Sequence, residues 1–124
     1  ELADIYGLRL DPDAYIWQLS VGEQQRVELV KVLTLGANLL ILDEPTVGMT
    51  SEELSQIMDV IRTIHSKLGL AIFLIEHRLR FVMELCERIQ CLVFGEAIAE
   101  GTPEEIQSNP QVIEAYLGKD MVET

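Results

Sequence analysis

The 124-residue chain carries 21 acidic and 9 basic side chains, which gives a formal net charge of −12 at pH 7. This acidic balance argues against a nucleic-acid partner. No apolar run approaches the roughly 18 residues of a membrane span and no export signal is visible, so we expect a cytoplasmic location. Cys86 and Cys91 lie in no metal-binding pattern, so we expect free thiols.

The stretch L-S-V-G-E-Q-Q-R, residues 19–26, predicts the start of a helix. Ser20 and Glu23 have the spacing of a capping box, and the apolar periodicity continues to about Leu35, before Gly36. Capping does not explain Gly22, because glycine inside a helix lowers the helix's stability by about 1 kcal/mol relative to alanine. Gly22 therefore indicates that another group approaches this backbone closely.

Two apolar segments further along the chain predict parallel strands. They are L-L-I-L-D-E-P, residues 39–45, and A-I-F-L-I-E, residues 71–76. Four consecutive apolar residues in the first segment indicate a strand buried on both faces. Between the segments, Thr50 and Glu53 predict a second capping box, and Gly69 predicts the end of that helix.

The last third of the chain predicts one helix, a strand pair and two short helices. The helix spans Leu79–Cys86, and the strands span Ile89–Phe94 and Ala97–Glu100. Thr102 and Asn109 each precede a proline, which is typical of a helix N-terminus. The element order predicts an α/β fold with parallel central strands, flanking helices and a short C-terminal strand pair.

Polar residues follow both predicted parallel strands at the point where each strand ends. Asp43 and Glu44 follow the first strand, and Glu76 and His77 follow the second. Ligands gather at the carboxyl ends of parallel strands. Carboxylates there can hold hydrated Mg²⁺ or accept a proton from water, and an imidazole can donate to a phosphate oxygen. Each of these residues taken alone is more commonly structural.

The ordered set L-S-V-G-E-Q-Q-R, L-L-I-L-D-E-P and L-I-E-H resembles the ATP-binding cassette (ABC) family of transporter ATPases over nearly the whole chain. The resemblance implies that residues 1–124 form the C-terminal part of one P-loop NTPase domain that uses ATP and Mg²⁺. It makes the first stretch the signature motif, formed by Ser20, Val21, Gly22 and Glu23. Ser20 and Gly22 would then bind the γ-phosphate of a nucleotide held by the opposite subunit.

The same resemblance implies roles for the strand-end residues. Asp43 would position Mg²⁺, Glu44 would polarise the attacking water, and His77 would contact the γ-phosphate. The implied partners are a second ATPase subunit and transmembrane permease subunits, with the protein peripheral on the inner face of the cell membrane.

The chain also departs from the family pattern. Val21 and Glu23 stand where the commonest signature has Gly and Gln, and Thr50 replaces the aspartate of the D-loop. No G-x-x-x-x-G-K-[ST] phosphate-binding loop occurs in the 124 residues. We therefore expect this chain alone to be inactive, and ATPase activity only when the domain is complete.

The resemblance leaves the transported solute open. The tail from Gly95 resembles ATPases of branched-chain amino-acid importers, whereas the signature region resembles those of sugar and nucleoside importers. We favour the branched-chain type because the matching tail is longer. A non-catalytic module for partner binding or dimerisation is the alternative, and a chromosome-maintenance ATPase is disfavoured because the chain has no flanking heptads or basic patch.

Overall fold

The computed structural model describes residue 4 and residues 7–117, and it divides the chain into two compact units. The first unit runs from Glu1 to His77, and the second from Arg78 to Thr124. Each unit is described below by itself.

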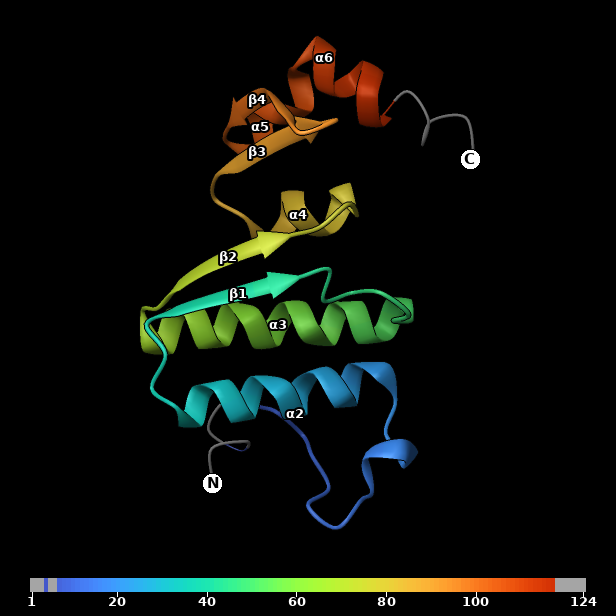
Figure 1. Ribbon diagram of the computed structural model, residues 1–124, viewed down its shortest axis with the longest axis vertical. Coiled ribbons are helices and arrows are strands. Elements are labelled where there is room, and N and C mark those ends of the chain that lie inside the picture. Colours follow the sequence, from blue (N-terminus) through green and yellow to red (C-terminus); the bar gives the residue numbers. More distant parts are fainter. Residues whose placement is uncertain (1–3, 5–6, 118–124) are drawn as a thin grey trace. The chain divides into compact units, whose positions relative to one another are not determined.

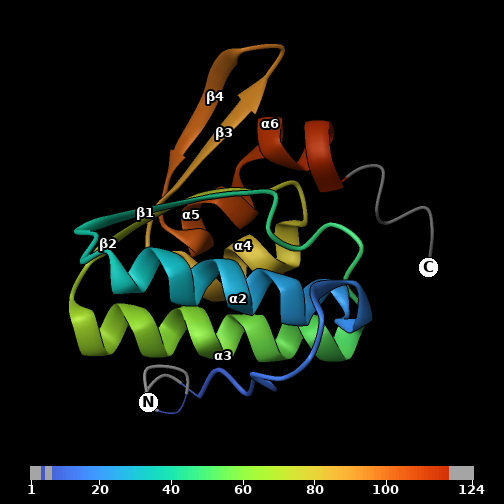
Figure 2. The same cartoon turned by 60° about the horizontal axis from the view of Figure 1, so that its bottom comes forward.

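The first unit combines two long helices with a pair of parallel strands (Figure 1). Its elements are η1 (Ile16–Gln18), α2 (Val21–Thr34), β1 (Leu39–Asp43), α3 (Ser51–Leu68) and β2 (Ala71–Ile75). Figures 1 and 2 place α2 and α3 on the same side of the strand pair. Leu29 of α2, Ile57 and Ile64 of α3, and Leu40 of β1 are among its buried apolar side chains.

The second unit is a helix followed by an antiparallel hairpin and short C-terminal helices. Its elements are α4 (Leu79–Leu85), β3 (Ile89–Val93), β4 (Glu96–Gly101), α5 (Pro103–Ser108), α6 (Pro110–Val112) and the π-helical turn η2 (Ile113–Leu117). Its core consists of Ile89, Cys91, Ile106 and Val112. Cys86 and Cys91 are free thiols, as predicted, and burial raises the pKa of both.

Local capping explains where the long helices begin and end. The predicted capping boxes are both present: the Ser20 hydroxyl accepts from the amide of Glu23 at the start of α2, and Thr50 and Glu53 do the same for α3. Gly69 ends α3 in the left-handed conformation, at φ 60°. These contacts span three or four residues, so the sequence alone predicts them well.

The parallel strands lie side by side, as predicted, with Leu39 opposite Ala71 and Asp43 opposite Ile75. The prediction that β1 is buried on both faces is wrong, because its residues alternate between exposed and buried. The register puts the exposed Ile41 directly opposite the exposed Phe73, which are 60% and 59% accessible. Both apolar side chains are therefore exposed, although Leu40 and Leu42 of the same strand are buried.

The α/β fold class with parallel strands, flanking helices and a C-terminal strand pair is confirmed. That residues 1–124 belong to one domain stays a prediction. Within the described residues, no helix is both long enough and apolar enough to cross a membrane.

Candidate active site

The parallel register brings the predicted strand-end residues to one edge of the sheet. Asp43 is the last residue of β1, and Glu44 follows it. The amide of Glu44 donates to the carbonyl of Ile75 at 2.8 Å, which continues the strand ladder for one more residue. Glu76 and His77 follow directly, so both chain segments leave the sheet at the same place.

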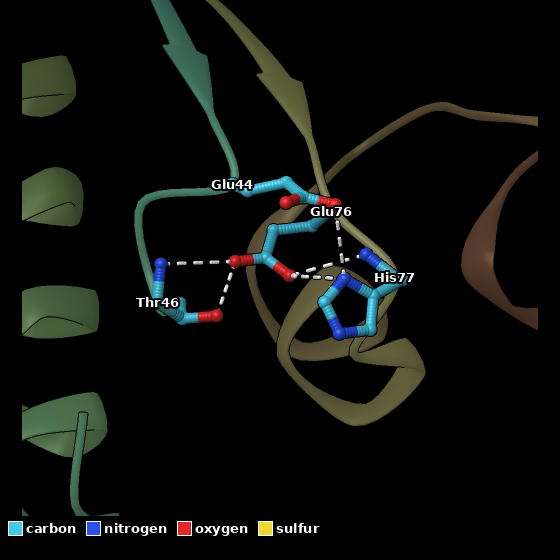
Figure 3. Close-up of polar contacts among 4 residues, drawn as sticks. All are labelled: Glu44, Thr46, Glu76 and His77. Atoms are coloured by element: carbon cyan, nitrogen blue, oxygen red, sulfur yellow. Dashed lines mark hydrogen bonds and ion pairs between the residues drawn. The ribbon is translucent and has the colours of Figure 1, made fainter. Parts of the chain in front are cut away.

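Glu44 and His77 face each other at this edge (Figure 3). His77 Nδ1 lies 3.3 Å from Glu44 Oε1, and the two side chains are 63% and 53% exposed. Glu44 also adopts a positive φ of 45°, which is uncommon for a non-glycine residue and costs on the order of 1 kcal/mol. A carboxylate held against an imidazole and open to water can orient a water molecule or accept its proton.

Glu76 lies beneath this pair and connects the loops that follow the two strands (Figure 3). Its side chain is fully buried. Glu76 Oε1 accepts from the amide of Thr46 at 3.1 Å and from the Thr46 hydroxyl, while Oε2 accepts from the amide of His77 at 3.1 Å. The sequence placed Glu76 at the edge but did not predict this role, because Thr46 is 30 residues away.

Removing the Glu76 carboxylate should destabilise the site. Glu76→Ala leaves the buried amide and hydroxyl of Thr46 without their acceptor, so we expect the free energy of unfolding to fall by about 1–3 kcal/mol. Urea unfolding measures the change. Glu96→Ala, which removes an exposed carboxylate from β4, is the control and should cost less than about 0.5 kcal/mol. Equal effects of both variants would contradict a positioning role for Glu76.

Asp43 has the chemistry expected of a Mg²⁺ ligand. It is exposed at the carboxyl end of β1. The described residues contain no group of three or more acidic, histidine or cysteine side chains that could hold a metal ion. Mg²⁺ keeps several waters and takes one or two carboxylates together with substrate phosphates, so a single accessible carboxylate fits this ion.

The predicted signature residues form the first turn of α2. Ser20 is the N-cap, and Glu23 Oε2 accepts from the Ser20 amide at 2.8 Å. Val21 is exposed. A Cβ added to Gly48 would lie 3.6 Å from Val21 Cγ2, so the loop after β1 reaches the start of α2.

A side chain does lie close to the Gly22 backbone, as the sequence predicts. It is the side chain of Glu53 from α3. The amide of Gly22 donates to Glu53 Oε1 at 3.2 Å, and a Cβ on Gly22 would lie only 3.0 Å from that oxygen. Ser20, at the same helix start, helps to lower the pKa of this carboxyl group. The sequence marked Glu53 only as a helix cap, because nothing local relates it to a residue 31 positions away.

Comparison with protein families gives two matches. Residues 3–47 match the ABC transporter family, and residues 98–122 match the branched-chain amino acid ATP-binding cassette transporter family. The chain belongs to the ABC transporter family. Ser20 to Glu23, Asp43 and Glu44 lie inside the segment matched to the ABC transporter family, whereas His77 lies outside both matched segments.

Similar ABC proteins differ in the solutes that their names state. The chain is 38% identical over 101 residues to the high-affinity branched-chain amino acid transport ATP-binding protein LivG of Salmonella typhimurium, covering 82% of this chain and 40% of LivG. It is 36% identical over 121 residues to the nucleoside import ATP-binding protein NupA of Lactococcus lactis, covering 98% of this chain and 24% of NupA. A glucose import ATP-binding protein of Haloferax volcanii is 36% identical over 124 residues, covering all of this chain and 22% of that protein.

Solved ABC structures share the fold. The protein cbiO1 of Clostridium perfringens, part of the ABC transporter complex cbiONQ, superposes with a TM-score of 0.78 at 29% identity, covering 91% of this chain and 45% of cbiO1. An ATP-binding cassette of another ABC transporter gives a TM-score of 0.75 at 28% identity, covering 84% of this chain and 42% of that cassette. This chain thus spans less than half the length of each of these relatives and solved structures.

Proposed function

We propose that this chain supplies the signature and water-activating residues of an ATP-hydrolysing subunit that powers an ABC importer. The observation that carries the proposal is the edge where Glu44 Oε1 lies 3.3 Å from His77 Nδ1, immediately after two paired parallel strands. Glu44 is open to water and held by the imidazole, which suits a residue that polarises the attacking water. His77 is assigned contact with the γ-phosphate.

Asp43 is the proposed Mg²⁺ ligand, and the bound ion would neutralise charge that develops on the phosphates. Ser20 and Gly22, with Val21 and Glu23 in the same turn, are proposed to bind the γ-phosphate of a nucleotide held by an opposite subunit. The amides at the N-terminus of α2 are suited to an anion. A second ATPase subunit and transmembrane permease subunits are the proposed partners, with the protein on the inner face of the cell membrane.

Branched-chain amino acids are the proposed solute class. The match of residues 98–122 to the branched-chain family and the 38% identity to LivG support it. A sugar or nucleoside importer is the second candidate, because NupA and the glucose importer protein match 98% and 100% of the chain. Uptake of labelled leucine, uridine and glucose by cells with and without the gene separates these solutes. Loss of leucine uptake alone supports the branched-chain amino-acid assignment. Loss of uridine or glucose uptake overturns it.

Hydrolysis itself is tested by phosphate release from two proteins. The 124-residue chain contains no lysine-bearing phosphate-binding loop, so we expect no ATPase activity from it. The full-length protein that contains the chain should hydrolyse ATP. A non-catalytic module for partner binding is the alternative, and an inactive full-length protein that still binds its partners would favour that alternative.

A further inference from the structure

The Glu53 carboxylate contacts Gly22 of the signature turn, to which the proposed function assigns a phosphate. The Gly22 amide donates to Glu53 Oε1 at 3.2 Å, and the neighbouring Ser20 side chain helps to lower the pKa of the same carboxyl group. Glu53 Oε2 meanwhile accepts from the amide of Thr50 at 2.9 Å, which completes the capping box of α3. One carboxylate therefore bridges the N-termini of α2 and α3.

Packing around Gly22 brings the carboxylate to this position. Gly22 is buried, and a Cβ there would lie 3.2 Å from both Cβ and Cγ of Glu53. Glycine thus makes room for the Glu53 side chain in the first turn of α2. The contact lies within one compact unit, since both residues belong to the segment that ends at His77.

The Glu53 carboxylate is ionised in this position. Hydrogen bonds, first that of Ser20 and then that of the Thr50 amide, lower the pKa of Glu53 from 4.5 to about 2. At neutral pH the first turn of α2 therefore already holds an anion. The free amides of a helix N-terminus stabilise a bound anion, whether it is a carboxylate or a phosphate.

We propose that Glu53 is a built-in competitor for phosphate: its carboxylate occupies the Gly22 amide, next to Ser20, and must leave before the signature turn can bind an incoming γ-phosphate. The proposal rests on the proposed function, because that function assigns phosphate to this turn. Binding of a γ-phosphate to the signature turn then displaces the Glu53 carboxylate. The nucleotide concentration needed for half-saturation is therefore higher than it would be if the Gly22 amide were free.

The test compares Glu53→Gln with the unmodified full-length protein. Gln keeps the capping position and removes the charge, since Glu and Gln both serve at N3 of a capping box. We expect the KM for ATP to fall about two- to fivefold, the size of an anion's interaction with a helix N-terminus, while kcat stays unchanged. Glu52→Gln is the matched control: it removes the same charge from the first turn of α3 at an exposed residue and should leave KM unchanged.

A second measurement does not depend on hydrolysis. The Gly22 amide resonance, identified by its loss in Gly22→Ala, is followed during titration with inorganic phosphate. The half-saturating phosphate concentration should be about two- to fivefold lower for Glu53→Gln than for the unmodified protein. Glu53→Ala, which also gives up the α3 cap, should change it in the same direction in spite of lower stability.

The outcomes separate this proposal from the proposed function. If the unmodified protein hydrolyses no ATP, the proposed function fails, and the phosphate titration still decides the role of Glu53. A Gly22 resonance that responds equally in the unmodified and Glu53→Gln proteins, or in neither, overturns the competitor role. An equal effect of Glu52→Gln assigns the change to net charge, and weaker phosphate binding in both Glu53 variants makes Glu53 a structural cap only.

Discussion

Glu44→Gln in the full-length protein should lower kcat for ATP hydrolysis by about 10²–10⁴-fold, the usual contribution of a general base. Gln has nearly the same shape, so it fills the same space beside His77, but it cannot accept a proton from the attacking water. ATP affinity should change little, because Glu44 is assigned to water and not to the phosphates. Single-turnover phosphate release and equilibrium ATP binding measure the two quantities separately.

The control for this prediction is Glu96→Gln. Glu96 is an exposed acid at the start of β4, outside the unit that carries Glu44 and His77, so the substitution makes the same change in net charge. We expect kcat within about twofold of the unmodified protein, as for an ordinary surface substitution. If Glu44→Gln also leaves kcat unchanged, Glu44 does not activate the water, and the role assigned to the Glu44 and His77 pair is wrong.

Ile64→Ala should lower the free energy of unfolding of the chain by about 2–5 kcal/mol. The Ile64 side chain is fully buried on α3, so truncation removes apolar contacts and leaves a cavity. Urea unfolding followed by circular dichroism measures the loss. Whole domains are stable by only about 5–15 kcal/mol, so Ile64→Ala can leave too little folded protein to measure. Ile64→Val removes one methylene group and should lower the free energy of unfolding by only about 0.5–1.5 kcal/mol.

Ile41→Ala is the matched control, since it removes the same atoms from a side chain that is 60% exposed on β1. It should cost well under half as much as Ile64→Ala in the same chain. Comparable losses would mean that Ile41 is covered in solution, which would contradict the open face of the β1 and β2 pair.

The helix and strand boundaries of this protein follow from short-range chemistry that a sequence shows directly. The capping boxes at Ser20 and Thr50 join residues three positions apart, and both predicted helices begin where these pairs place them. The parallel pairing of the apolar strands also followed from the sequence, because an intervening helix is the usual link between neighbouring parallel strands. The edge that carries Asp43, Glu44 and His77 was predicted for that reason.

The sequence by itself determined which residues cap, which form strands and which stand at the strand ends, because each of these depends on neighbours a few positions away. Only the tertiary structure decided which acceptor each polar donor found. It placed the buried Glu76 against Thr46 across 30 residues, and Glu53 against Gly22 across 31. It also left one face of β1 exposed where the apolar run predicted burial. Such pairings depend on how whole elements pack, and no local pattern in the chain encodes them.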